Sequence, residues 1–179
     1  MEPGLDLPFA IFGHSMGATI GFELARELRQ RHWAAPRRLI MSGGRAPHRP
    51  SPLSPLAGLP AGKFLEAVQE RYGCFSNEIL QLREMLDLLL PILRADLKLF
   101  ETYQCTLEPP LDCPISVFGG VDDATVTKDE LADWELHTTA AFDLCMLPGG
   151  HFFPQESRDH VLRALEERLT GRADAAIRG

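Results

Sequence analysis

The pentapeptide Gly13-His14-Ser15-Met16-Gly17 constrains the fold more than any other part of this sequence. It follows a short apolar run, residues 8–12, and it opens a pattern with helical periodicity. A strand, a tight turn and a helix in this order form a nucleophile elbow, which exposes a serine at the turn. Strand and helix approach closely there, so the residues two before and two after the serine must be small, as Gly13 and Gly17 are. We therefore predict Ser15 as a nucleophile.

An acid follows the serine along the chain. In α/β-hydrolases the order is serine, acid, histidine. A β-type run over residues 114–118 ends at Gly119-Gly120, and Asp122 and Asp123 follow on the loop. We predict Asp123 as the acid because it stands three residues after the second glycine and three before Val126. Asp122 is the main alternative.

A base follows a second β-type run, residues 142–147. Pro148-Gly149-Gly150 closes this run and His151 comes next, so we predict His151 as the base. The serine, the acid and the histidine then all lie just past the C-terminal ends of strands, where an open parallel sheet has its ligand crevice.

These residue types suit acyl transfer. A serine hydroxyl is a weak nucleophile, so His151 would remove its proton during attack and return it to the leaving group. Asp123 would fix the tautomer of the imidazole and stabilise the imidazolium. The backbone N–H of Met16 would donate to the developing oxyanion, and a second donor normally comes from a loop after an earlier strand.

Only residues 1–7 precede the predicted elbow strand. This architecture usually places several strands, and the other half of the oxyanion hole, before that point. We therefore expect the N-terminal strands to be missing and the elbow strand to expose an unpaired edge. Loss of one oxyanion donor costs about 100- to 1000-fold in rate, so we also expect this chain alone to be weakly active or inactive.

The sequence predicts one α/β domain, with a mostly parallel sheet flanked by helices and a helical insertion. Residues 1–45 would carry the elbow, and residues 111–179 the acid and histidine loops. Residues 46–110 begin with a proline-rich linker and continue with leucine-rich helical segments, in which Pro91 would kink a helix or begin a second one. This insertion would act as a lid over the crevice. Alternatively, its leucines form only a packed helical subdomain.

Other elements of the core follow from periodicity. We expect helices over residues 16–32, 127–137 and 155–169 and a strand over residues 38–41, besides those at 8–12, 114–118 and 142–147.

Composition excludes several classes of protein. With 179 residues, 45% of them hydrophobic and 24% charged, the chain suits one ordinary globular domain. A net charge of -7 gives no electrostatic footprint for nucleic acid or an anionic membrane. No apolar run is long enough to cross a bilayer and no signal peptide is evident, so we expect a cytoplasmic location. The spacing of the cysteines suits neither zinc nor disulfides, so we expect small buried thiols at all four positions, Cys74, Cys105, Cys113 and Cys145.

Several further residues have two interpretations. His14 is expected to be a local packing or hydrogen-bonding residue, and three other histidines are expected on the surface: His48, His137 and His160. Trp134 is most simply a core anchor. Arg94 and Asp96 form either a contact within the lid or a solvated helix face.

The chain resembles the type II thioesterases that accompany polyketide and nonribosomal peptide synthetases. The resemblance lies in the elbow segment 12–18, the lid stretch 90–96, the acid loop 119–123, Trp134 and the histidine segment 148–153. The lid and histidine motifs are much more specific than the elbow. Carried over onto matching positions, Ser15 is the nucleophile, Asp123 the acid and His151 the base.

The resemblance implies a substrate and a partner. Members of this family hydrolyse acyl groups from the phosphopantetheine arm of acyl or peptidyl carrier proteins and so clear stalled or misprimed intermediates. The arm enters as part of the substrate, so no separate cofactor and no metal are expected. Three alternatives are an acyl-CoA or fatty-acid-synthase-type thioesterase, a carboxylesterase, and a catalytically incomplete remnant that only binds a carrier protein.

Overall fold

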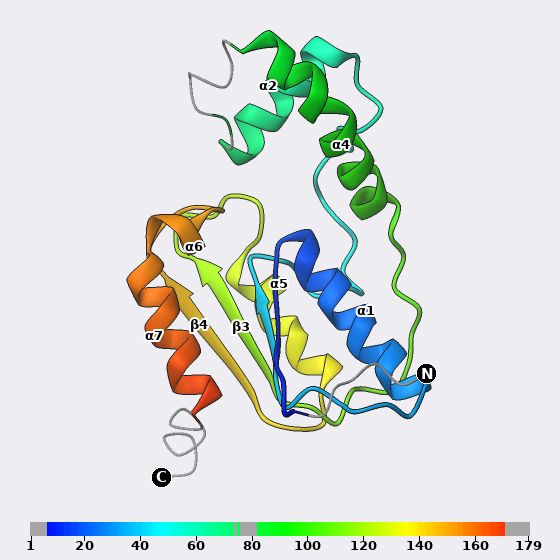
Figure 1. The fold of residues 1–179 in the computed structure, drawn as a ribbon, viewed down its shortest axis with the longest axis vertical. Helices are drawn as coiled ribbons and strands as arrows, with labels where there is room; N and C mark the ends of the chain where they lie inside the picture. Colours follow the sequence, from blue (N-terminus) through cyan, green and yellow to red (C-terminus); the bar gives the residue numbers. More distant parts are fainter. Residues whose placement is uncertain (1–6, 74, 76–81, 171–179) are drawn as a thin grey trace. The chain divides into compact units, whose positions relative to one another are not determined.

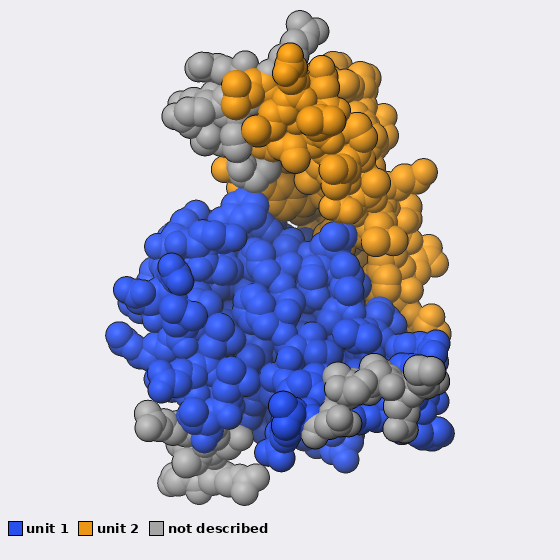
Figure 2. All heavy atoms as spheres, in the orientation of Figure 1, with its two compact units in different colours: residues 1–49, 107–179 blue, residues 50–106 orange. Residues whose placement is uncertain are grey.

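The computed structural model describes residues 7–73, 75 and 82–170 (Figure 1). The chain forms two compact units (Figure 2): residues 1–49 together with 107–179, and residues 50–106. The predicted catalytic residues all belong to the first unit.

The first unit is built on a four-stranded sheet. Its strands are β1 (Ile11–His14), β2 (Leu39–Ser42), β3 (Ile115–Gly120) and β4 (Phe142–Leu147), and they lie side by side in this order. Every neighbouring pair is parallel. The C-terminal ends of β1, β3 and β4 therefore meet at one edge of the sheet, and this edge carries the predicted site.

Helices cover both faces of this sheet (Figure 1). Successive strand residues point to opposite faces. Leu39 and Met41 pack in one cluster with Phe22 of α1 (Met16–Gln30) and Leu131 of α5 (Lys128–Ala132). Ile40, between them, packs in a second cluster with Val161 and Ala164 of α7 (Arg158–Leu169). A parallel sheet flanked by helices confirms the predicted α/β fold class.

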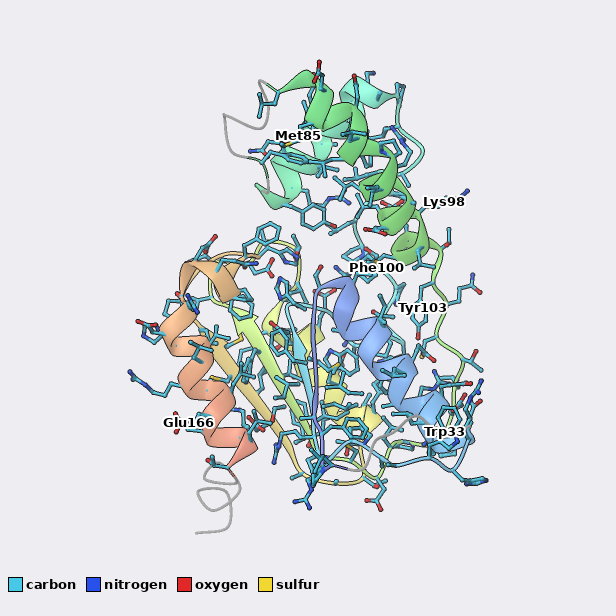
Figure 3. All side chains as sticks on the ribbon, in the orientation of Figure 1. Trp33, Met85, Lys98, Phe100, Tyr103 and Glu166 are labelled. Carbon is cyan, nitrogen blue, oxygen red and sulfur yellow. The ribbon has the colours of Figure 1, made fainter. Side chains whose placement is uncertain are left out.

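The amphipathic pattern of α7 explains its position. Val161 and Ala164 are buried against the sheet, whereas Glu166 is exposed and extends from the side of the helix away from the sheet (Figure 3). Trp134, in the 3-10 helix η1 (Asp133–His137), is fully buried, and its indole N–H donates to the carbonyl of Gly44 at 2.8 Å. The expectation that Trp134 anchors the core is confirmed.

The second unit contains α2 (Ala61–Tyr72) and α4 (Arg83–Thr102). Phe64 and Val68 of α2 are buried in a cluster that includes Leu90, Leu93 and Leu97 of α4. Arg94 donates to the carbonyls of Ala57 and Leu59, and its guanidinium lies 4.2 Å from the centre of the Phe64 ring. Asp96 is exposed. Met85 and Lys98 extend from α4 (Figure 3). A lid role for residues 46–110 stays a prediction.

Several expectations about element bounds are wrong. β1 spans Ile11–His14 and not residues 8–12. β3 continues through Gly119-Gly120 because these residues pair with Met146 and Leu147 of β4. α4 runs through Pro91 as one helix, so Pro91 does not begin a second helix, one of the two alternatives for this residue. The stretch 127–137 divides into α5 and η1, and the stretch 155–169 divides at Ser157 into α6 (Phe153–Glu156) and α7. Across the described residues, none of the helices combines the length and the apolar character needed to cross a membrane.

Candidate catalytic site

Ser15 lies on the tight turn between β1 and α1. Its backbone has φ 55° and ψ -120°, a conformation that non-glycine residues seldom adopt. A serine at this position of a helix usually accepts a hydrogen bond from a backbone N–H of the first turn. Here the Ser15 side chain makes no such bond to the helix. Its hydroxyl is instead available at the end of the sheet, as a nucleophile elbow requires.

Gly13 and Gly17 differ in what they contribute to this turn. A Cβ on Gly13 would lie 2.1 Å from the Gly17 carbonyl oxygen, a distance that backbone atoms cannot accommodate. A Cβ on Gly17 would meet none of the described atoms within 4 Å. The prediction that both positions must be small is therefore correct for Gly13 and wrong for Gly17. The close approach runs from the strand to the helix backbone, so only the strand residue needs to lack a side chain.

The structure brings Ser15, His151 and Asp123 together from the ends of three strands. Ser15 Oγ lies 3.0 Å from His151 Nε2, and His151 Nδ1 lies 2.8 Å from Asp123 Oδ2. The His151 side chain is 6% exposed and the Asp123 side chain is 0% exposed. A serine hydroxyl, an imidazole and a carboxylate thus form one hydrogen-bonded chain, in which the imidazole and the carboxylate are shielded from water.

Backbone hydrogen bonds hold the acid loop against the histidine loop. The Val121 N–H donates to the Leu147 carbonyl at 2.8 Å, and the Asp122 N–H donates to the Gly149 carbonyl at 3.0 Å. The Asp122 residue is exposed. The structure therefore places Asp123, and not the alternative Asp122, beside His151.

Thr125 also belongs to the site, although the sequence did not predict it. Its backbone N–H and its hydroxyl both donate to Asp123 Oδ1, at 2.8 and 2.7 Å. Burial raises the pKa of Asp123, but the hydrogen bonds from His151 and Thr125 together outweigh burial, so the pKa lies below its ordinary value. The Asp123 carboxylate is therefore ionised at neutral pH. A threonine two residues after an acid was the available sequence signal.

His14 packs behind the base. Its Nδ1 lies 3.0 Å from Ser42 Oγ, and its ring centre lies 5.1 Å from that of His151. Burial, reinforced by the neighbouring His151, lowers the pKa of His14 to about 4. The expectation of a packing and hydrogen-bonding residue is confirmed, and His14 remains neutral when His151 takes up a proton.

Two of the histidines expected on the surface are half-buried and paired. His48 Nδ1 lies 2.7 Å from His137 Nε2, and the His137 ring packs edge-on against Phe22 at 5.0 Å. Burial, together with His48 and Arg26, lowers the pKa of His137 to about 4. The surface expectation is wrong for both, because tertiary packing brings His48 onto η1. His160 is exposed, as expected.

The low pKa values of His14 and His137 predict a loss of stability in acid. Each group has a pKa near 6.5 when unfolded and about 4 when folded. Between these values the unfolded chain binds more protons, so the free energy of unfolding falls as the pH drops from 6.5 to about 4. We expect His137→Gln to reduce this fall and His160→Gln to leave it unchanged, measured by urea unfolding at several pH values. If the free energy of unfolding of His137→Gln fell as much as that of the parent, the lowered pKa of His137 would be contradicted.

The remaining predicted site features are placed as follows. Met16 is the first residue of α1, where backbone N–H groups have no acceptor within the helix.

Cys113 is buried, and burial raises the pKa of its thiol to about 11, whereas Cys105 and Cys145 are only partly buried. Cys74 lies outside the described residues. Within the part of the chain that the structure describes, no cluster of three or more potential metal ligands occurs.

The sequence of this chain is similar to a known protein family and to a characterised protein. A family model described as a thioesterase domain matches residues 2–169. The linear gramicidin dehydrogenase LgrE of Brevibacillus parabrevis is 41% identical over 171 residues, which cover 93% of this chain and 64% of that protein.

Two solved structures are also similar. RedJ, a thioesterase from the prodiginine biosynthetic pathway in Streptomyces coelicolor, is 38% identical with a TM-score of 0.80, covering 87% of this chain and 61% of that one. YbtT, a type II thioesterase from the yersiniabactin NRPS/PKS biosynthetic pathway, is 32% identical with a TM-score of 0.78, covering 90% and 65%. The chain thus spans between 61% and 65% of the length of these three proteins.

Proposed function

The chain belongs to the thioesterase family, and from this premise we propose that it hydrolyses acyl groups from the phosphopantetheine arm of carrier proteins. In this role it would edit stalled or misprimed intermediates of polyketide or nonribosomal peptide biosynthesis. The observation that carries the proposal is the hydrogen-bonded chain from Ser15 through His151 to Asp123. The similarity to RedJ and YbtT, which are thioesterases of such pathways, supports the choice of substrate.

The geometry supports a two-step reaction. His151 Nε2 accepts the Ser15 proton while Oγ attacks the thioester carbonyl carbon, and the Met16 N–H donates to the oxyanion. The tetrahedral intermediate collapses, the C–S bond breaks, and His151 protonates the departing thiol. Water then attacks the acyl-serine with His151 again as base, which releases the carboxylic acid and restores Ser15. Asp123 stabilises the imidazolium in both steps.

The proposed substrate implies which proteins bind this chain. We propose acyl or peptidyl carrier proteins as partners, in the cytoplasm where such synthases act. The phosphopantetheine arm arrives with the substrate, so the reaction as proposed uses the side chains of this chain and no separate cofactor.

The two adjacent aspartates provide a matched test of the acid. We expect Asp123→Asn to lower the hydrolysis rate by about 10³- to 10⁴-fold, because an amide neither stabilises the imidazolium nor enforces the same tautomer. Asp122→Asn removes the same charge from an exposed position and should change the rate less than about 3-fold. The rates would be compared under single-turnover conditions. A larger loss of rate for Asp122→Asn than for Asp123→Asn would show that Asp122, and not Asp123, acts as the acid.

Intact mass spectrometry of a loaded carrier protein tests the function directly. Carrier protein bearing an acetyl or butyryl group is incubated with the chain, and the acyl mass is followed over time. We expect weak but Ser15-dependent loss of the acyl mass, faster than the release from an equal concentration of acetyl- or butyryl-CoA. Faster turnover of the acyl-CoA would favour an acyl-CoA thioesterase. Persistence of both substrates with a folded sample would contradict hydrolysis by this chain and favour the catalytically incomplete remnant that only binds a carrier protein.

A further inference from the structure

We propose that Thr125 is a positioning residue that fixes the protonation pattern and the orientation of His151, an inference that rests on the proposed function. The Thr125 hydroxyl contacts two members of the site at once. It donates to Asp123 Oδ1 at 2.7 Å, and its oxygen lies 3.0 Å from His151 Nδ1. Thr125 itself is 9% exposed, so water has little access to replace the hydroxyl.

The number of available protons determines how these contacts are arranged. A hydroxyl has one proton, which here goes to the ionised carboxylate of Asp123 because a charged acceptor makes the stronger bond. The lone pairs of Thr125 Oγ1 then remain for His151. They can face Nδ1 only if Nδ1 carries the ring proton. Asp123 Oδ2 and Thr125 Oγ1 thus both accept from the same Nδ1–H, which leaves Nε2 unprotonated toward Ser15.

The backbone of Thr125 is fixed on both sides. Its N–H donates to Asp123 Oδ1 at 2.8 Å, and its carbonyl accepts from Arg45 Nη2 at 2.7 Å. The same guanidinium pairs with Glu130 at 3.1 Å, and both partners of this ion pair have side chains less than one-sixth exposed. Arg45 thus holds the Thr125 backbone independently of the catalytic side chains, whereas the second anchor is the Asp123 carboxylate itself.

A pair of substitutions isolates the hydroxyl. Thr125→Val keeps the shape of the side chain and removes the hydroxyl, whereas Thr125→Ser keeps it. Thr127→Val is the matched control. It also removes a threonine hydroxyl, two residues away, but that hydroxyl caps α5 and forms a capping box with Glu130. Loss of that cap costs stability. The Thr127 hydroxyl bonds Glu130 and contacts no described catalytic side chain.

The rate at which a fluorophosphonate labels Ser15 is the primary measurement, since it reports activation of the serine without a thioester substrate. We expect Thr125→Val to slow labelling roughly 10-fold or more, Thr125→Ser to restore most of the rate, and Thr127→Val to leave it within about 3-fold. In an Asp123→Asn background, Thr125→Val should slow labelling by less than about 3-fold, because Thr125 acts through the acid and the base. Equal effects of Thr125→Val in both backgrounds would overturn the proposal.

A spectroscopic measurement separates this inference from the proposed function. In nitrogen-15 histidine spectra, the His151 Nδ1–H resonance should persist in the parent and in Thr125→Ser, and exchange faster with water in Thr125→Val. If the parent labels with fluorophosphonate but leaves carrier thioesters intact, the proposed substrate fails while the role of Thr125 is still supported. If the parent does not label, the spectrum alone decides. An Nδ1–H signal identical in Thr125→Val and parent overturns the role of Thr125.

Discussion

Replacement of Ser15 by alanine is expected to lower thioester hydrolysis by about 10⁴-fold or more, the largest effect of any single substitution in this chain. The hydroxyl is the atom that forms the acyl-enzyme bond, and its oxygen lies 3.0 Å from the base. Without it, no acyl-serine can form, and His151 can only assist direct attack by water on the thioester. The measurement is release of the acyl mass from a loaded carrier protein under single-turnover conditions.

The Ser15 variant should remain folded, because the Ser15 side chain makes no capping bond to α1. Its positive φ is equally strained for alanine, so the free energy of unfolding should change by less than about 1 kcal/mol. Ser157→Ala, between α6 and α7, is the matched control and should retain the parent rate. Undiminished hydrolysis by folded Ser15→Ala would remove Ser15 from the mechanism.

Substitution of Gly13 by alanine is expected to have the largest effect on stability. The added Cβ would lie 2.1 Å from the Gly17 carbonyl oxygen and 2.4 Å from the Gly17 carbonyl carbon. These are backbone atoms of α1, so relief requires that the helix move away from β1. We expect a loss of about 3 kcal/mol or more in the free energy of unfolding, measured by urea titration followed by circular dichroism.

Gly17→Ala is the control for this effect. The same methyl group is added on the other side of the same contact, where it meets no described atom within 4 Å. Alanine also suits a helix better than glycine, by up to about 1 kcal/mol, so this variant should be neutral or slightly stabilised. Equal destabilisation by the two substitutions would show that the elbow tolerates neither side chain, as the pentapeptide pattern alone suggests.

The sequence predicted the bounds of β2, β3 and β4 to within about two residues because strand patterns are local, whereas β1 spans Ile11–His14 and not residues 8–12. β4 begins and ends where its β-type run does, at Phe142 and Leu147. The turn at Ser15 follows from neighbouring residues, and the loops after β3 and β4 follow from glycine-rich stops. Bounds were missed where pairing or packing overrides local preference, as at Gly119-Gly120, which continue β3 because β4 lies beside them.

What the sequence by itself determined is the α/β class and the candidates Ser15, Asp123 and His151. Only the tertiary structure decided which aspartate meets the base, that Thr125 bridges the pair, and that His48 lies against His137. Ser15 and His151 are 136 positions apart, and His48 and His137 are 89 apart. Helical and strand periodicity report on neighbours within a few residues, so contacts over such separations are fixed only when the sheet and its helices pack together.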